Sequence, residues 1–390
     1  LSSDSGAGVF RDVADTMDPF VTRITGLGFK TPHFSYSPGE VHIYDSANVG
    51  SAPEGVITLD SPSMRGRDEP SLRAVTDHEH FHHTQFAYIN FNDWPSWGRW
   101  SIEGTARMMQ DKLWNDLDAN GGMLTFWGEV SNYMAQTDVR LVDQSYSACL
   151  FWQYLCEQLG TVHTEPEYGV DVIRRFWEET DGRSPDSMGA IKRMISHFSS
   201  RSLNDLFRDF VLANYTKDLD LSSINQASRY RYIDDDTAAY PDVQVHLRKT
   251  FPPTIGPTAA HVNDYAAKYY IGQPAENTVG KVVGFKSTGN RAAYSVVAVR
   301  SGKVISLHRG VGTEYARSFY NSRKTPLSEI AAVVAGLDSG ADYTYTFAAG
   351  DVKMSIVEPT FTRLAYVGEP DNPDKFIARL QITGPAELGG

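Results

Sequence analysis

The chain has little cysteine, no long apolar stretch and fewer basic than acidic residues, and each shortage limits what the protein can be. Only two of its 390 residues are cysteine, Cys149 and Cys156. They stand seven positions apart in a strongly helical stretch, where the rise of about 10 Å is too large for a disulfide between them. We expect both to be small apolar core residues. They therefore give no evidence of the compartment in which the protein works.

The shortage of positive charge and of apolar runs excludes two kinds of partner. Lysine and arginine number 36 against 48 aspartate and glutamate residues, which gives a net charge of −12. This balance argues against nucleic acid and against anionic membrane surfaces as partners. No apolar run approaches the ~20 residues that a membrane span needs. A hydrophobic content of 41% with 22% charged residues is ordinary for a soluble globular protein.

Patterns along the chain predict an α+β protein with separate helical and all-β parts. Periodic helical segments dominate at about 70–215, and short strand-like segments separated by glycine, asparagine and serine follow. We expect a mainly helical domain at 1–222, with a small N-terminal β/α part, and an accessory β-sandwich at 223–370. The tail, 371–390, reads as a linker and one strand. That strand either joins the sandwich or begins a further domain.

Four of the 11 histidines fall in one short stretch, AVTDHEHFHHTQF, at 74–86. At about 100° per residue on a helix, His78 and His82 lie about 40° apart, so both can bind one metal ion. His80 lies about 200° from His78, and His83 about 140° from it. We expect these last two side chains to point away from the ion.

The residues HEHFH, 78–82, match the H-E-x-x-H motif of zinc sites, in which the glutamate acts as general base. That glutamate is Glu79, which lies beside the histidine pair. The alternative is a surface helix whose histidines are solvated. Apolar neighbours such as Phe81 and Phe86 favour a packed helix instead.

A third ligand is available in Glu103, 21 residues after His82. It begins a second predicted helix, SIEGTARMMQDKL, for which Ser101 is the expected N-cap. The longer motif H-E-x-x-H-x-x-G-x-x-H is not met, because Gln85 and Tyr88 occupy its glycine and last histidine positions. Two histidines and a glutamate with an open fourth position form a catalytic zinc site. The alternative for Glu103 is a first-turn acid that favours the helix dipole.

These motifs resemble the gluzincin zinc metallopeptidases, which combine H-E-x-x-H with a glutamate some twenty residues later. The resemblance is closest to a broad bacterial peptidase group, MA-like, with W-x-x-E-G-x-A after the first helix. Here that pattern is Trp100, Glu103, Gly104 and Ala106. It covers roughly 70–215 and implies a zincin-like catalytic domain.

Two departures from the family pattern bear on mechanism. Thermolysin-like members carry a carboxylate four residues after the ligand glutamate, where this chain has Arg107. Asp77 or another acid would then have to support a ligand histidine. The G-x-M-E-N motif of the aminopeptidase branch is absent from the sequence. This absence favours an endopeptidase.

The resemblance implies that His78, His82 and Glu103 bind Zn²⁺. Glu79 would activate the zinc-bound water for attack on a peptide bond of a protein or peptide substrate.

A second donor is needed for the negative charge that develops on the substrate's carbonyl oxygen. Tyr146, in YSACLFWQYL, is the candidate by position. Tyr88, Tyr133 and His163 are alternatives, and a core aromatic role for Tyr146 is equally compatible with its position.

A calcium site is a further hypothesis. In DLDANGG, Asp116, Asp118 and Asn120 offer oxygen atoms at alternate positions, as in an EF-hand loop. The twelfth position is Trp127 rather than glutamate, so the loop is not a complete EF-hand. A helix C-terminal turn is the alternative.

The sequence thus predicts a zinc-dependent endopeptidase. The rival hypothesis is a catalytically silent binding or adhesion protein that keeps the zincin fold, against which the retained Glu79 argues. We expect a secreted or cell-surface protein, because the chain carries a β-module and is acidic. The start at Leu1 fits a removed leader, and a boundary within a longer chain is the alternative.

Overall fold

The described parts of the chain form a mixed α+β structure with a β-sandwich-like part, as the sequence predicts. Leu1–Asp351 form one compact unit. A domain boundary at 222/223 within it stays a prediction, and the predicted linker and strand at 371–390 lie outside the described residues. The structure is a computed structural model that describes residues 19–33, 40–44, 50–51, 56–60, 69–113, 128–233, 240–251, 255–274, 280–321 and 326–350.

A small sheet precedes the helices that carry the predicted site. Its strands are β1 (Glu40–Tyr44), β2 (Gly50–Ser51) and β3 (Val56–Asp60). Strand β3 is central, parallel to β1 and antiparallel to β2. Its alternate residues Ile57 and Leu59 are fully buried, as expected for a strand with one face on the core. This sheet is the predicted N-terminal β part.

The following part is helical, and one of its helices starts at a capping box. Ser202 and Asp205 form a capping box at the start of α10. Ser101 is not the N-cap that the sequence suggests: its hydroxyl donates to the Trp97 carbonyl, and the helix begins two residues earlier. Within the described ranges, no helix is both long and apolar enough to cross a membrane. The α-helices are α3 (Glu69–Phe86), α4 (Arg99–Leu113), α6 (Glu129–Ala135), α7 (Cys149–Leu159), α8 (Val170–Glu178), α9 (Ser187–Phe198) and α10 (Leu203–Thr216), and the 3₁₀ helices are η1 (Phe91–Trp97), η3 (Leu141–Asp143), η4 (Tyr146–Ala148) and η5 (Ala227–Tyr230).

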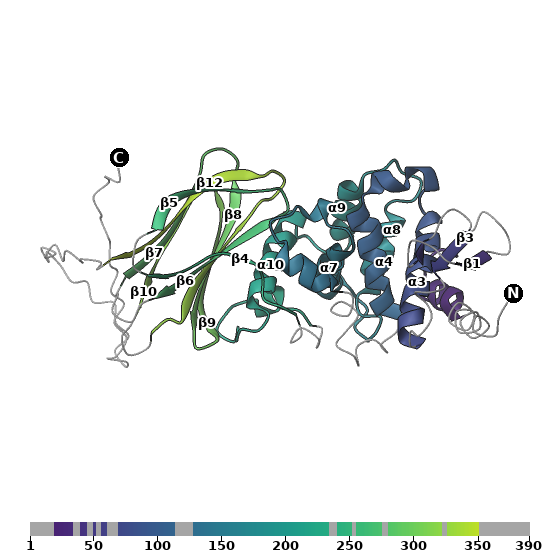
Figure 1. Ribbon diagram of the computed structural model, residues 1–390, viewed down its shortest axis with the longest axis horizontal. Coiled ribbons are helices and arrows are strands. Elements are labelled where there is room, and N and C mark those ends of the chain that lie inside the picture. Colours follow the sequence, from purple (N-terminus) through teal and green to yellow (C-terminus); the bar gives the residue numbers. More distant parts are fainter. Residues whose placement is uncertain are drawn as a thin grey trace, which may run out of the picture. The chain divides into compact units, whose positions relative to one another are not determined.

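Helix α7 forms the middle of the helical core, with nearly every side chain buried. Cys149 and Cys156 on this helix are buried and free, as expected of small apolar core residues. The indole of Trp152 stacks on that of Trp100 in α4, with ring centroids 5.5 Å apart. Trp152 Nε1 also donates to the Trp100 carbonyl at 3.1 Å. Helix α4 therefore packs on α7 through one face and on α3 through another (Figure 1).

Gly104 permits the close approach of α4 to α7. A Cβ atom at this position would lie 3.1 Å from both Ala148 Cβ and Trp152 Cδ1, which is tighter than ordinary packing. The neighbouring indole and helix leave little room to relax. The glycine of the E-G-x-A pattern is thus explained by packing rather than by backbone conformation.

We expect Gly104→Leu to lower the free energy of unfolding by about 1–3 kcal/mol, because the added side chain overpacks the α4–α7 contact. Thermal or urea unfolding followed by circular dichroism measures this change. Gly26→Leu is the control, since a Cβ at the exposed Gly26 meets no atom within 4 Å. Equal effects of the two substitutions would contradict this account of Gly104.

A β-sandwich follows the helices. Its sheets have the strand orders β10-β7-β12-β5 and β4-β6-β11-β8-β9, and neighbouring strands are antiparallel except β4 and β6. Phe285 and Tyr294 stack between the two sheets with ring centroids 5.1 Å apart. The strands are β4 (Val245–Phe251), β5 (Ile255–Val262), β6 (Ala267–Pro274), β7 (Gly280–Ser287), β8 (Ala292–Arg300), β9 (Lys303–Gly312), β10 (Glu314–Tyr320), β11 (Glu329–Ala335) and β12 (Ala341–Gly350).

The five-stranded sheet is covered on both faces at β8, which explains why this strand is apolar almost throughout. Tyr294 faces the other sheet, whereas Val297 belongs to a second cluster that includes Leu212 of α10. Arg309 of β9 forms an ion pair with Asp209 of α10. The sandwich and the helices therefore share buried contacts.

Candidate metal centre

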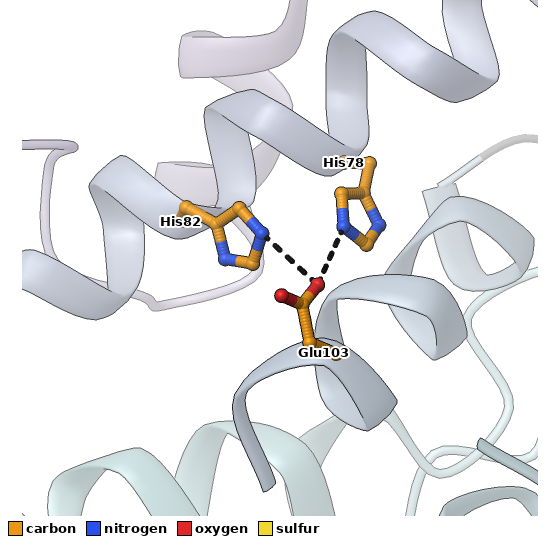
Figure 2. Close-up of side chains that lie close together, drawn as sticks. All are labelled: His78, His82 and Glu103. Carbon is orange, nitrogen blue, oxygen red and sulfur yellow. Dashed lines mark hydrogen bonds and ion pairs between the residues drawn. The ribbon is translucent and has the colours of Figure 1, made fainter. Parts of the chain in front are cut away.

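The contact between α3 and α4 brings His78, His82 and Glu103 together (Figure 2). The two histidines are one turn apart on α3 and project toward α4, and Glu103 projects back from near the start of α4. Their exposed fractions are 5%, 3% and 8%, so the cluster is buried. The structure thus assembles the three residues that the sequence nominates as ligands.

One carboxylate oxygen faces both imidazole rings. Glu103 Oε2 lies 3.2 Å from His78 Nε2 and 3.5 Å from His82 Nε2. The ring planes are nearly perpendicular, at 87°, with centroids 4.7 Å apart. One ligand atom from each residue lies within 4.8 Å of the others, a spacing that ligands about 2.0–2.2 Å from one ion can adopt. The cluster can therefore bind a metal ion.

The other two histidines of the stretch lie on other faces of α3, as predicted. The ring of His80 stacks on Phe20 with centroids 4.7 Å apart. His83 Nδ1 lies 2.9 Å from the backbone carbonyl oxygen of His33. Both side chains are buried, so α3 is not a surface helix with solvated histidines.

Gln85 supports His82 from the side away from Glu103. Gln85 Oε1 lies 2.8 Å from His82 Nδ1, and Gln85 Nε2 donates to the Ile102 carbonyl at 2.9 Å. The family pattern predicts an acid in this role, such as Asp77, and gives no reason to expect Gln85. Its spacing of three residues from His82 on one helix face was the available signal.

Burial and mutual contact set the pKa values of the cluster. Burial lowers the pKa of His78 to about 4, although the hydrogen bond to Glu103 opposes it. Burial also opposes charge on His82, but contact with Glu103 outweighs it and raises the pKa of His82. For Glu103, burial favours the neutral acid, but the two histidine contacts outweigh it and lower the pKa. The cluster therefore pairs an ionised carboxylate with one readily protonated imidazole.

Glu79 adjoins the cluster without belonging to the set of converging ligand atoms. It is buried, with 7% of its surface exposed. Burial raises the pKa of Glu79 to about 7; the positive charge of His82 opposes the rise and the negative charge of Glu103 adds to it. A carboxyl group with such a pKa can accept and release a proton at neutral pH.

Tyr146 lies beside His78, with ring centroids 5.5 Å apart. The guanidinium groups of Arg107 and Arg99 lie over its ring, 4.8 and 5.8 Å from the centroid. Burial and the nearby negative charge of Glu103 raise the pKa of Tyr146 to about 12. The hydroxyl group therefore keeps its proton and can act as a hydrogen-bond donor.

The alternatives to Tyr146 make their contacts elsewhere. The Tyr88 hydroxyl accepts from the backbone N–H of Lys30 at 2.8 Å. Tyr133 packs on Phe210 in the core, and the ring of His163 lies against a neighbouring tyrosine in its own loop. Of the four candidates, Tyr146 is the one in ring contact with the cluster in the described part of the chain.

Arg107, where the family pattern has a carboxylate, has partners of its own. It pairs with Glu129 at 4.0 Å and donates to Gln110 Oε1 at 2.7 Å. The calcium candidates Asp116, Asp118 and Asn120 lie outside the described residues, so that hypothesis stays a prediction.

Comparisons with known proteins add little. No protein-family model and no curated protein matches the chain. Tripeptidyl peptidase 2 matches with a TM-score of 0.22 and 9% identity, over 28% of this chain and 11% of that one. A pre-peptidase C-terminal domain of collagenase from Bacillus anthracis gives 0.21 and 8%, over 28% and 100%. A family 6 carbohydrate-binding module gives 0.16 and 13%, over 27% and 97%. At these scores none of them supports a function, which has to be inferred from the site.

Protons should compete with the metal ion at this site. Metal binding needs neutral His82, whose pKa is raised above its ordinary 6.5. We therefore expect about one divalent metal ion per chain at alkaline pH, with an affinity that falls about tenfold for each pH unit below that pKa. Titration against a chromogenic chelator at several pH values measures this.

The matched variants for that titration are His82→Gln and His83→Gln. The first removes a ligand and should abolish tight binding, whereas the second changes a buried histidine on another face of α3 and should leave binding intact. Equal binding by the two variants would contradict the assignment of the ligands.

Proposed function

We propose that the chain is a zinc-dependent endopeptidase of the gluzincin type. The observation that supports this most directly is the convergence of His78, His82 and Glu103 in one buried cluster with Glu79 beside it. A metal site with a purely structural role has no use for an adjacent carboxyl group whose pKa is raised to about 7.

Zinc fits the groups that converge. Two imidazole nitrogens and one carboxylate oxygen are the ligands of one class of catalytic zinc site, which leaves a fourth position for water or substrate. His78 Nε2, His82 Nε2 and Glu103 Oε2 would hold the ion. Bound zinc supplies Lewis acidity, which lowers the pKa of water and polarises a carbonyl group.

Glu79 is the proposed general base. In its ionised form it accepts a proton from the attacking water, whose oxygen forms a bond to the peptide carbonyl carbon. The carboxylic acid then returns this proton to the amide nitrogen as the carbon–nitrogen bond breaks, so the amine leaves neutral. A pKa near 7 suits both transfers at neutral pH.

Tyr146 is the proposed donor to the substrate's carbonyl oxygen as negative charge develops on it. Its hydroxyl stays protonated at working pH because its pKa is about 12. Its ring contacts His78 and lies under the guanidinium of Arg107, and these contacts hold the donor beside the cluster before the reaction begins.

The substrate class is a protein or peptide cleaved internally, since the sequence lacks the G-x-M-E-N motif for a free amino terminus. The sandwich is proposed as an accessory domain. We also propose that the enzyme acts outside the cell or at its surface, which the acidic charge and the β-sandwich support.

Glu79→Gln should lower kcat/KM for an unfolded protein substrate by about 10²–10⁴-fold, because the amide cannot accept the proton. Zinc content should stay at about one ion per chain, since Glu79 is not a proposed ligand. Release of labelled peptides and metal analysis of the same preparation provide the two measurements. Glu178→Gln is the control, since Glu178 is an exposed residue of α8 that pairs with Arg174 and Arg175.

A zinc-loaded parent that cleaves nothing would instead support the catalytically silent binding protein. Equal cleavage by the parent and Glu79→Gln would reject Glu79 as the base.

Tyr146→Phe should lower kcat by about 10²-fold, the usual cost of losing one donor to a developing negative charge. The ring and its contact with His78 are retained, but the hydroxyl also hydrogen-bonds to Glu103, so zinc affinity should change much less than kcat. Steady-state kinetics with a fluorogenic peptide measure the effect, with Tyr168→Phe as the control. An unchanged kcat would reduce Tyr146 to a packing residue.

A further inference from the structure

We infer that Gln85 is the positioning residue of the metal centre: it fixes the tautomer and the ring orientation of His82 and so sets metal affinity. This inference rests on the proposed metal site but not on peptidase activity. It gives a role to a buried polar side chain that lies outside the ligand motif and has no part in the proposed proton transfers.

The hydrogen-bond partners determine which end of the Gln85 amide faces His82. One end lies 2.9 Å from the Ile102 carbonyl oxygen, which can only accept, so that end is the NH₂ group. The other end is therefore the carbonyl oxygen, 2.8 Å from His82 Nδ1. The hydrogen-bond partners therefore determine which end of the Gln85 amide is nitrogen and which is oxygen.

The same logic fixes the proton on His82. An amide oxygen only accepts, so His82 Nδ1 must carry the hydrogen. In the neutral ring, the lone pair is then on Nε2, the nitrogen that faces Glu103 Oε2 at 3.5 Å. Gln85 thus selects the tautomer that can bind a metal ion through Nε2.

An amide suits this position better than a carboxylate. The NH₂ end donates to the Ile102 carbonyl and to Thr105 Oγ1, at 2.9 and 3.1 Å. A carboxylate would place a negative oxygen against that carbonyl and add charge beside Glu103 and Glu79. The amide avoids both and joins α3 to α4.

Thr105, which accepts a hydrogen bond from Gln85, is held in place by further hydrogen bonds. Thr105 Oγ1 donates to the Ser101 carbonyl at 2.7 Å and accepts from Trp177 Nε1 of α8 at 3.3 Å. Thr105 and Trp177 are fully buried, so neither side chain has room to turn. A chain of hydrogen bonds therefore runs from α8 through Thr105 and Gln85 to His82.

The two ligand histidines differ in this respect. His78 Nδ1 is buried and makes no hydrogen bond to the described residues, whereas His82 Nδ1 is bonded to Gln85. The ring of His82 is thus held from both sides, by Gln85 and by Glu103. We therefore expect replacement of Gln85 to weaken metal binding mainly by disordering the ring of His82.

The test compares metal binding by Gln85→Met, Gln85→Glu and the parent, without any substrate. Gln85→Met keeps side-chain size but removes the acceptor, and should weaken Zn²⁺ affinity by about 10–100-fold. Gln85→Glu keeps an acceptor for His82 Nδ1–H but loses the bond to the Ile102 carbonyl, so it should recover part of that loss. Chelator competition gives the affinity, and the visible spectrum of the Co²⁺ form reports the ligand geometry.

Gln110→Met is the matched control. Gln110 is also a buried glutamine between the same two helices, since its Nε2 donates to the Ala74 carbonyl, and its Oε1 accepts from Arg107 rather than from a proposed ligand. Its replacement should change affinity less than about twofold and leave the Co²⁺ spectrum unaltered. Circular dichroism and thermal unfolding establish that all variants are folded.

The outcomes are distinguishable. Parent-like affinity in Gln85→Met, or equal losses in Gln85→Met and Gln110→Met, would overturn the inference. A parent that binds no metal would overturn it together with the metal centre. A parent that binds zinc without cleaving any substrate would reject the proposed function alone.

Discussion

Burial of Glu103 between two histidines is the contact on which the helical part depends. Ionisable groups are costly inside a protein unless they meet partners of opposite charge or hydrogen-bonding character. Here the partners come from different helices, so α3 and α4 must cross at one place for the three side chains to satisfy one another. Gln85 fixes the same crossing through neutral hydrogen bonds.

The crossing explains two adjacent residues of the sequence at once. Glu103 faces α3, whereas Gly104 faces α7 and the indole of Trp152. Successive residues on a helix point about 100° apart, so α4 can direct a candidate ligand to α3 and a close packing surface to α7. The stacked rings of Trp100 and Trp152 fix the position of α4 against α7.

The choice of ligand histidines and the presence of the sandwich could be predicted, because both follow from patterns within short segments of the sequence. Helical spacing alone separates His78 and His82 from His80 and His83, and strand periodicity alone indicates the sandwich. The contact of Gln85 with His82 could be predicted from their spacing on α3, but its bonds to Ile102 and Thr105 could not, because they depend on which residues of α4 lie opposite. The start of α4 was misplaced for a related reason: the Ser101 hydroxyl bonds to a preceding 3₁₀ helix that leads directly into α4. Contacts between elements, rather than patterns within one, account for both.

The pairing of Glu103 with His82 bears on whether the protein folds before or after it binds a metal ion. Small zinc domains fold only when the ion arrives, because nothing else holds their ligands together. Here the carboxylate and imidazole supply opposite charges to each other within a large apolar core. Folding and metal binding can then be separate steps, because the folded chain does not need an ion to bring these side chains together.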